Sequence, residues 1–363
     1  MPRHTRAVIH LDHIRHNYEL VNQLAPQSKN MAIIKANAYG HGMIEVANSL
    51  THLAPAFGVA IFEEAVTLRE AGINQPILIL QGINQAQDYQ IAAQYGLWVT
   101  LHNLDQLHTL LATPLKNKLK VWLKLDTGMH RLGFNQNDLE TVIKEVLNCP
   151  WVDDEFVVSS HYSCASQSDN RVTQQQFEQF NQMVKLIPFN ENLQKSIANS
   201  PAIVGFPESN LDWNRPGIML YGVAMFDVPH NSDKLTKPAM SFESEVIAIR
   251  KIKAGESVGY GQKWVATANA TIATVAVGYA DGYPRHAESG TPVFINGKIA
   301  KLVGCVSMDL ITIDVSDHDQ VAIGDRVELW GEQIPVSLVA NHANTIGYDL
   351  VSGVSARVPR EYR

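Results

Sequence analysis

The stretch FGVAIFEEAVTLREAGINQPILIL, residues 57–80, contains one complete copy of the pattern that decides the fold. Apolar runs at 57–61 and 76–80 predict two buried strands. Between them, residues 62–71 carry polar and apolar faces at helical spacing, and Gly72 ends the predicted helix. A strand, a helix and a second strand in this order are typical of a parallel βαβ unit.

The same alternation recurs from about residue 30 to residue 220, where short apolar runs separate longer Gln/Asn/Glu-rich segments such as 172–186. The predicted strands are 31–34, 57–61, 76–80, 97–100, 118–125, 156–160, 195–198 and 211–214. Eight parallel strands, each followed by a helix, close into a (β/α)8 TIM-like barrel. An open doubly wound sheet would instead have a glycine-rich phosphate loop after its first strand. We therefore predict a barrel.

After residues 230–233 the chain becomes rich in β-forming residues, with turns at Ala254-Gly255 and Asn296-Gly297. The predicted strands here are 241–252, 270–278, 293–299, 302–306, 310–315 and 326–329. A chain of 363 residues also exceeds one typical domain of about 100–200 residues. We expect an α/β barrel at 1–230 followed by an all-β C-terminal domain at 231–363.

The composition argues against several classes of partner. The 29 basic and 36 acidic residues leave a net charge of −7 without a Lys/Arg block, which disfavours nucleic acid. The N-terminus lacks the apolar core of a secretory signal, and no run reaches about 18 apolar residues. We therefore expect a soluble, cytoplasmic protein that does not bind a membrane.

Cysteine and histidine spacing gives no reason to expect a disulfide or a metal. Three widely spaced cysteines match neither a disulfide framework nor a zinc pattern, so we expect reduced thiols at Cys149, Cys164 and Cys305. The N-terminal histidines lack Cys and carboxylate partners at ligand spacing, so a solvated helix is the better interpretation of His4, His10, His13 and His16.

Polar residues follow the predicted barrel strands, at the end where barrel enzymes place their active sites. Five strands deliver Lys35, Lys124, His161, Asn199-Ser200 and Arg215 to this rim. One such residue alone is more often a solvated rim residue than a catalyst. Five together would build a cationic, hydrogen-bonding bowl suited to a phosphorylated, electron-poor ligand.

These residues belong to motifs that resemble, in chain order, the signatures of the alanine racemases. The motifs are KANAYGHG (35–42), LDTGMHRLGF (125–134), ANSPA (198–202), RPGIMLYG (215–222), VGYG (258–261), VGYADGYPR (277–285) and VSMD (306–309). The resemblance covers nearly the whole chain. It implies pyridoxal 5'-phosphate as cofactor, interconversion of L- and D-alanine, and a head-to-tail homodimer.

The resemblance assigns the two acid/base groups. Lys35 links covalently to the cofactor and serves one face of the substrate Cα, while Tyr260, donated by the partner subunit, serves the other face. Arg131 lies near both the tyrosine and the substrate. Lys124 matches a position that is carbamylated in some relatives, so we expect a CO2 adduct there that orients Arg131.

Arg215 is implied to face the pyridine nitrogen, where many pyridoxal enzymes place a carboxylate. Arginine cannot accept a proton, so it weakens the cofactor as an electron sink and limits transamination. The residues implied to hold the cofactor are Lys35, Tyr39, His161, Asn199, Ser200, Arg215, Gly217, Ile218 and Tyr348. Those implied to form the substrate pocket are Arg131, Met308, Asp309 and Tyr279.

Three alternatives remain open. A broader amino acid racemase acting on serine or lysine would share this machinery and differ only in its pocket walls. A decarboxylase on the same barrel is disfavoured by Arg215, and a non-catalytic cofactor carrier is disfavoured by Tyr260 and Arg131. The sequence also leaves open whether the enzyme supplies D-alanine for peptidoglycan or consumes it.

Overall fold

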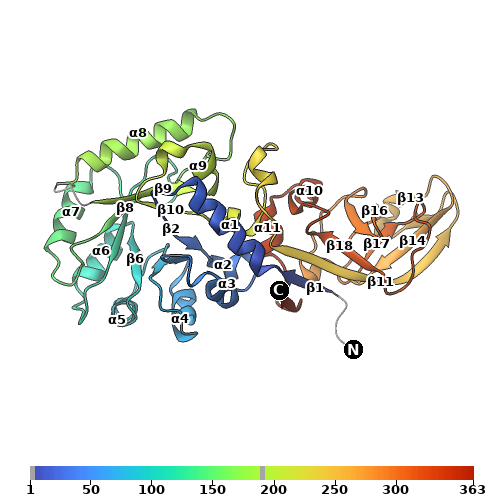
Figure 1. Ribbon diagram of the computed structural model, residues 1–363, viewed down its shortest axis with the longest axis horizontal. Coiled ribbons are helices and arrows are strands. Elements are labelled where there is room, and N and C mark those ends of the chain that lie inside the picture. The colour runs from blue at the N-terminus through green and yellow to red at the C-terminus, as the bar shows by residue number, and fades with distance from the viewer. Residues whose placement is uncertain (1–4, 189–192) are drawn as a thin grey trace.

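The computed structural model describes residues 5–188 and 193–363, and His4 lies outside the described residues. Figure 1 shows two lobes, a helix-rich lobe formed by the first part of the chain and a strand-rich lobe formed by the last part. The long strand β11 (Met240–Ile252) leads from the junction into the second lobe.

The first lobe is a parallel barrel whose strand segments run in the order β2-β10-β9-β8-β7-β6-β5-β4-β3. They are β2 (Lys29–Asn30), β3 (Ala32–Ile33), β4 (Phe57–Val59), β5 (Ile77–Ile79), β6 (Trp98–Leu101), β7 (Val121–Lys124), β8 (Val157–Ser159), β9 (Gln194–Asn199) and β10 (Trp213–Arg215). Only Met31 separates β2 from β3, and the Ile33 N–H still donates to Pro216 O at 3.0 Å. The two segments act as one strand that closes the barrel, so the predicted barrel with eight strand positions is confirmed.

Helices surround the barrel and pack apolar residues against it. They are α1 (Leu11–Leu24), α3 (Met43–Leu50), α4 (Phe62–Glu70), α5 (Ala86–Gln94), α6 (Leu104–Leu111), α7 (Leu139–Asn148), α8 (Arg171–Lys185) and α9 (Ser200–Gly205). The short segment α2 (Lys35–Tyr39), which follows β3, has positive φ at residues 36–39 and is a left-handed turn. The helices predicted at 62–71 and 172–186 are α4 and α8. Inside the barrel a separate apolar cluster includes Trp122 and Trp213, whose rings meet edge to face at 5.8 Å.

The second lobe is built on a sheet in the order β14-β17-β16-β15-β18-β11-β1-β19, in which β14 also pairs with β11. Its further strands are β1 (Arg6–Ile9), β14 (Ala270–Val275), β15 (Pro292–Ile295), β16 (Lys298–Leu302), β17 (Ile311–Asp314), β18 (Arg326–Trp330) and β19 (Arg360–Tyr362), with a separate ribbon of β12 (Ser257–Val258) and β13 (Trp264–Val265). The Asn296-Gly297 turn joins β15 to β16 with both residues at positive φ, as an Asn-Gly hairpin requires.

The second lobe differs from the sequence prediction in three places. The strand predicted at 302–306 is not formed: β16 ends at Leu302, and Gly304 turns at φ +76° and packs on the backbone of Val258. Two helices lie among the strands, α10 (Val336–His342) and α11 (Gly347–Ser352). The first strand of the chain, β1, pairs with β11 and β19 and so belongs to this sheet.

Short 3-10 helices connect the larger elements: η2 (Pro207–Ser209), η3 (Ile218–Tyr221), η4 (Asn231–Lys234), η5 (Tyr260–Gln262) and η6 (Tyr279–Asp281). The N-terminal histidines fasten α1 to the segment that joins the lobes. His13 Nδ1 lies 2.8 Å from Pro238 O, and His16 Nε2 lies 3.1 Å from Leu235 O. His10 Nε2 lies 3.1 Å from Ser241 Oγ at the start of β11. These three histidine side chains therefore have a structural role at the junction between the lobes.

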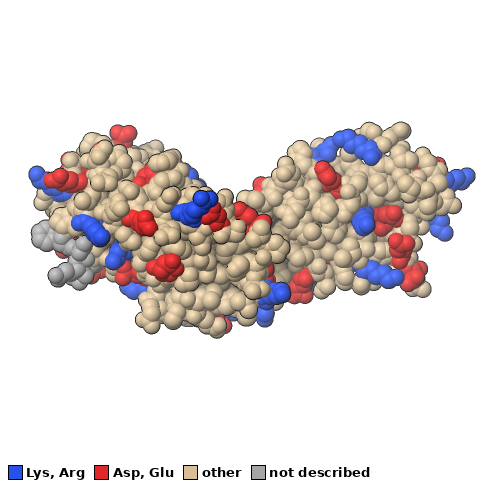
Figure 2. All heavy atoms as spheres, turned by 90° about the horizontal axis from the view of Figure 1, so that it is seen from above, with Lys and Arg blue, Asp and Glu red and all other residues tan. Residues whose placement is uncertain are grey.

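Within the described ranges, none of the helices combines the length and the apolar character needed to cross a membrane. The face in Figure 2 narrows between the two lobes, and acidic and basic side chains are interspersed on it.

Candidate active site

A cavity of about 660 Å³ opens at the carboxyl ends of the barrel strands. It gathers eleven of the predicted site residues: Lys35, Tyr39, Lys124, Arg131, His161, Asn199, Ser200, Arg215, Gly217, Ile218 and Tyr348. Lys124 ends β7, Asn199 ends β9 and Arg215 ends β10, so the strands themselves aim these side chains. Among the described residues, four cationic side chains and one carboxylate, that of Asp349, line the space, which gives it a positive field.

The turn that follows Lys35 is left-handed. Residues Ala36, Asn37, Ala38 and Tyr39 have φ of 52°, 53°, 54° and 51°. L-residues avoid this conformation by about 1–2 kcal/mol each. Contacts within the same segment hold the turn, because buried His41 Nδ1 lies 3.0 Å from Ala38 O and 2.9 Å from Tyr39 O. A side chain at Gly40 would overlap Val351 O, so this glycine lets α11 close on the turn.

Both lysines of the cavity are shifted toward their neutral forms. Burial lowers the pKa of Lys35, Arg131 lowers it further, and Glu64 opposes the change. Burial, followed by the charges of Arg215, Arg131 and Lys35, lowers the pKa of Lys124 to about 8. Neutral amines are nucleophiles, so the cavity is equipped for covalent chemistry on a carbonyl or on carbon dioxide near neutral pH.

Arg215 is buried and held by groups that carry no negative charge. Its guanidinium donates to Ser160 O, to Ser196 Oγ and, at 3.3 Å, to Ile197 O. Burial lowers its pKa to about 10, which still leaves it cationic at neutral pH. Its Nη2 lies 3.4 Å from Nδ1 of His161, whose pKa burial and the neighbouring cations hold well below the usual value. His161 is therefore an uncharged ring beside a fixed cation.

Hydroxyls and backbone amides converge at one end of the cavity. Ser200 Oγ accepts from the Gly217 N–H at 2.8 Å and from the Met219 N–H at 3.3 Å. A Cβ at Gly217 would lie 2.6 Å from Tyr39 Oη, so only glycine leaves this space open. Burial raises the pKa of Tyr39, and raises that of Tyr348 to about 12, so both phenols remain protonated donors. Such a cradle suits a phosphate dianion.

The loop that carries Arg131 folds around one carboxylate. Asp126 Oδ1 accepts from the backbone N–H groups of Gly128 and His130, both at 3.0 Å. The ring Nδ1 of His130 lies 2.9 Å from Asp126 Oδ2, and the His130 backbone has φ of 54°. Asp126 thus shapes the turn before Arg131, a role that the DTGMHR motif alone does not reveal.

Four predicted site residues do not reach this cavity within the chain. Tyr260, Tyr279, Met308 and Asp309 all lie in the second lobe, where the Tyr260 side chain is 72% exposed. The Tyr279 N–H donates to Ser307 O and the Ala280 N–H donates to Met308 O, so two of the loops are joined. Arg357, which sequence reasoning missed, donates to Asp309 at 2.5 Å and to Asp281 at 2.8 Å.

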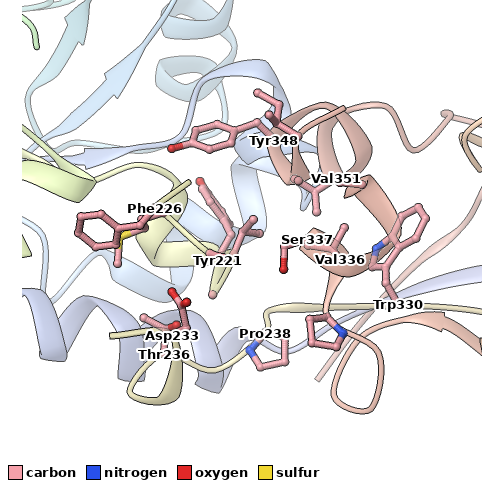
Figure 3. A pocket seen from close by; sticks show the side chains of 18 of the residues that line it. Tyr221, Phe226, Asp233, Thr236, Pro238, Trp330, Val336, Ser337, Tyr348 and Val351 are labelled. Carbon is pink, nitrogen blue, oxygen red and sulfur yellow. The ribbon is translucent and has the colours of Figure 1, made fainter. Parts of the chain in front are cut away.

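A second, larger cavity of about 910 Å³ lies at the junction of the lobes (Figure 3). Its described walls include Asp227, Asp233 and Glu332 and contain no Lys, Arg or His. Phe226, Trp330 and Tyr348 contribute aromatic surface. An acidic, apolar space repels phosphate, so the smaller barrel cavity is the candidate active site.

A barrel with a cationic cavity and a cradle of hydroxyl and amide groups at its strand ends, followed by a β-rich lobe, is typical of an enzyme that binds a phosphorylated ligand. The family model "Alanine racemase, N-terminal domain" matches residues 9–225, and "Alanine racemase, C-terminal domain" matches residues 239–362. The chain belongs to the alanine racemase family, which confirms the resemblance seen in its motifs.

Individual relatives agree over the full length. The chain is 45% identical to an alanine racemase of Alteromonas mediterranea over 99% of each sequence. The biosynthetic alanine racemase structure of Pseudomonas aeruginosa shares 43% identity and a TM-score of 0.95, with 99% of each chain covered. The alanine racemase structure of Bartonella henselae, which contains covalently bound pyridoxal phosphate, shares 30% identity and a TM-score of 0.90 over the whole of both chains.

Proposed function

We propose that this protein racemises alanine with pyridoxal 5'-phosphate bound in the barrel cavity. The observation that carries the proposal is the convergence of Lys35, Arg215 and the Ser200–Gly217 cradle on one cationic space. When bound, the cofactor supplies an electron-poor ring that acidifies the Cα–H of an attached amino acid. The residues of this chain must then bind, orient and move the proton.

Lys35 would hold the cofactor and exchange the proton on one face of Cα. Its lowered pKa supports this role, because a base must be neutral before it accepts a proton. Inversion requires a second group on the opposite face. Tyr260 is largely exposed and lies in the second lobe, so it would serve a neighbouring copy of the chain. The proposal therefore requires a homodimer with two shared sites.

Binding would be divided between the two ends of the cavity. Tyr39, Ser200, Tyr348 and the backbone of Gly217 and Ile218 would hold the phosphate, while His161 lies against the ring. Asn199 Oδ1 accepts from the Ala202 N–H at 3.2 Å, which orients the segment carrying Ser200. Arg215 would face the ring nitrogen and, since it cannot accept a proton, suppress transamination.

The substrate pocket would be completed by the partner's Met308, Asp309 and Tyr279. A small, aromatic-walled pocket there would favour a methyl side chain. Arg131 would meet the substrate from the barrel side. The three cysteines are free, which suits a reducing compartment, and we place the enzyme in the cytoplasm.

Lys124 would carry carbon dioxide. Its neutral amine would attack CO2, form an N–C bond and release one proton to water, so the residue becomes an anionic carbamate that orients Arg131. The pKa of about 8 provides the neutral amine. Protein prepared in ¹³C-bicarbonate should show one protected carbamate resonance that K124M lacks, and an unmodified amine in experimental density at neutral pH would count against it.

The test of the function uses two variants and one control. K35A should lose the visible absorbance band of the lysine-bound cofactor, and Y260F should lose racemisation in both directions. Y95F, which alters a tyrosine outside the cavity, should behave as wild type. Normal racemisation by Y260F would refute the two-base assignment. Comparable turnover of serine or lysine would indicate the broader racemase, and CO2 release would indicate a decarboxylase.

A further inference from the structure

Glu64 connects the turn after Lys35 to the neighbouring strand. It lies in the first turn of α4, directly after β4, which pairs with β3. Its Oε1 accepts from the Ala36 N–H at 2.7 Å. Its Oε2 accepts from the Ala60 N–H at 2.8 Å and from the Ile61 N–H at 3.4 Å. One carboxylate therefore bridges two adjacent strand ends.

The position of the Ala36 amide makes this contact informative. The amide belongs to the peptide bond that joins Lys35 to Ala36, the first residue of the left-handed turn. The far end of the turn is fixed by other groups, including Arg360 Nε, which donates to Gly40 O at 3.2 Å. Among the described residues, Glu64 is the acceptor for the Ala36 N–H. Backbone hydrogen bonds from the Ala38 N–H to Ile34 O and from the Gly40 N–H to Ala36 O also hold this end of the turn, and Glu64 adds the side-chain contact that ties it to β4.

Glu64 also contributes a charge beside the lysine. Among the groups acting on Lys35, Arg131 lowers the pKa and Glu64 raises it. The Glu64 carboxylate therefore limits how far the surrounding cations lower the pKa of the Lys35 amine. Geometry and charge therefore point to the same residue.

We propose that Glu64 is a positioning residue for Lys35, which clamps the left-handed turn at 36–39 to the end of β4 and so fixes the direction of the lysine side chain. This inference rests on the proposed covalent role of Lys35. Misplacement of a reacting group by about 1 Å is enough to slow a reaction about 100-fold. Loss of the clamp should therefore reduce turnover more than it reduces substrate binding.

The test compares E64Q with E63Q in the full-length, cofactor-loaded enzyme. Glutamine keeps the shape of Glu64 but replaces one accepting oxygen by an NH2 group, so at least one of the three N–H donors would face another donor. Glu63 is exposed on the same helix. E64Q should lower kcat about 10- to 100-fold, change KM less than about threefold, and shift the pH titration of the visible band to lower pH. E63Q should change none of these.

A readout that does not depend on activity is backbone hydrogen exchange, measured by mass spectrometry with and without cofactor. Peptides covering 36–42 should exchange at least about tenfold faster in E64Q, while peptides from β6 and β7 keep their rates. E64D keeps the negative charge, but its shorter side chain cannot span both strand ends. It should therefore keep the wild-type pH midpoint of the visible band and still show the faster hydrogen exchange at 36–42. This variant tests the proposal even if E64Q folds poorly.

Two results separate the positioning role from the role of Lys35. If E64Q matches E63Q in kcat, titration and exchange while K35A still loses the band, the positioning role is overturned and the Lys35 assignment stands. If K35A keeps the band, the Lys35 assignment fails, and the proposal built on it fails as well.

Discussion

Replacing Gly217 by alanine should weaken cofactor binding through one steric contact. The added Cβ would lie 2.6 Å from Tyr39 Oη, about 1 Å inside an ordinary van der Waals contact. The steric argument rests on this contact alone, because Gly217 has a negative φ of −120°. Tyr39 cannot easily retreat, because its ring packs 4.9 Å from the Tyr221 ring and 6.3 Å from the Tyr348 ring.

The expected loss follows from the hydrogen bond that Tyr39 would give to the phosphate. A hydrogen bond to a charged group contributes about 1.5–3 kcal/mol, so G217A should weaken binding roughly 10- to 150-fold. Y39F removes the same hydroxyl and should have a similar effect. The double variant should bind about as well as Y39F alone, because the clash with the hydroxyl is gone and the remaining contact, 3.3 Å to the ring Cζ, needs a shift of only a few tenths of an ångström.

Pyridoxal phosphate titrations of the four apoproteins, followed by visible absorbance, complete this double-mutant cycle. Urea unfolding of each apoprotein checks that the overpacking costs no more than about 1–3 kcal/mol of stability. Additive losses in the double variant would refute the steric reasoning. Wild-type affinity in G217A would refute the placement of the phosphate.

Two further predictions concern charges around the site. R357Q removes the ion pairs to Asp281 and Asp309, which order the Asp309 loop. It should raise KM for alanine several-fold in steady-state assays and leave the cofactor band unchanged. An unaltered KM would show that Arg357 does not order this loop. Folding lowers the pKa of Lys124 from 10.5 to about 8. The buried charge therefore destabilises the folded state fully below pH 8, and this destabilisation disappears as the pH rises toward 10.5. In CO2-free buffer, K124M should therefore stabilise the apoprotein against urea by about 1–3 kcal/mol at pH 7 and by less at pH 10, and a gain independent of pH would contradict the shift.

The barrel could be predicted because its signal is local and repeated. Each buried strand is a short apolar run followed by a helix, and the polar residue after the run marks the carboxyl end of the strand. This is why the positions of Lys35, Lys124 and Arg215 along the chain are enough to group them at one rim. The Asn296-Gly297 hairpin was equally accessible, because positive φ at both positions favours that pair.

The parts that sequence reasoning missed depend on contacts between distant segments. Helix α11 has six residues, too few for a helical period to show, and it forms by packing on the turn at 36–40. Asn37 and Gly40 tolerate positive φ, but Ala36, Ala38 and Tyr39 favour right-handed backbone, so the local sequence does not predict the left-handed turn after Lys35. The sequence prediction includes residues 6–9 in the barrel domain at 1–230 without a strand, but β1 pairs with β11, more than 230 residues later.

The signals for the positioning residues were weaker but not always absent. Glu64 stands at the third position of a predicted helix, where a carboxylate commonly caps backbone amides, and that pattern could have drawn attention to it. Arg357 gave no signal, because its partners Asp281 and Asp309 are set by the fold of loops far away in the sequence.

The most direct test of the shared site mixes two inactive proteins, K35A and Y260F, under conditions that exchange subunits. In a mixed dimer, the barrel with Lys35 would receive an intact Tyr260 from the other chain, while the second site would carry both defects. Random exchange makes half of the dimers mixed, so activity should return to about one quarter of the wild-type value. If both groups act within one chain, every site keeps a defect, and mixing would restore no activity.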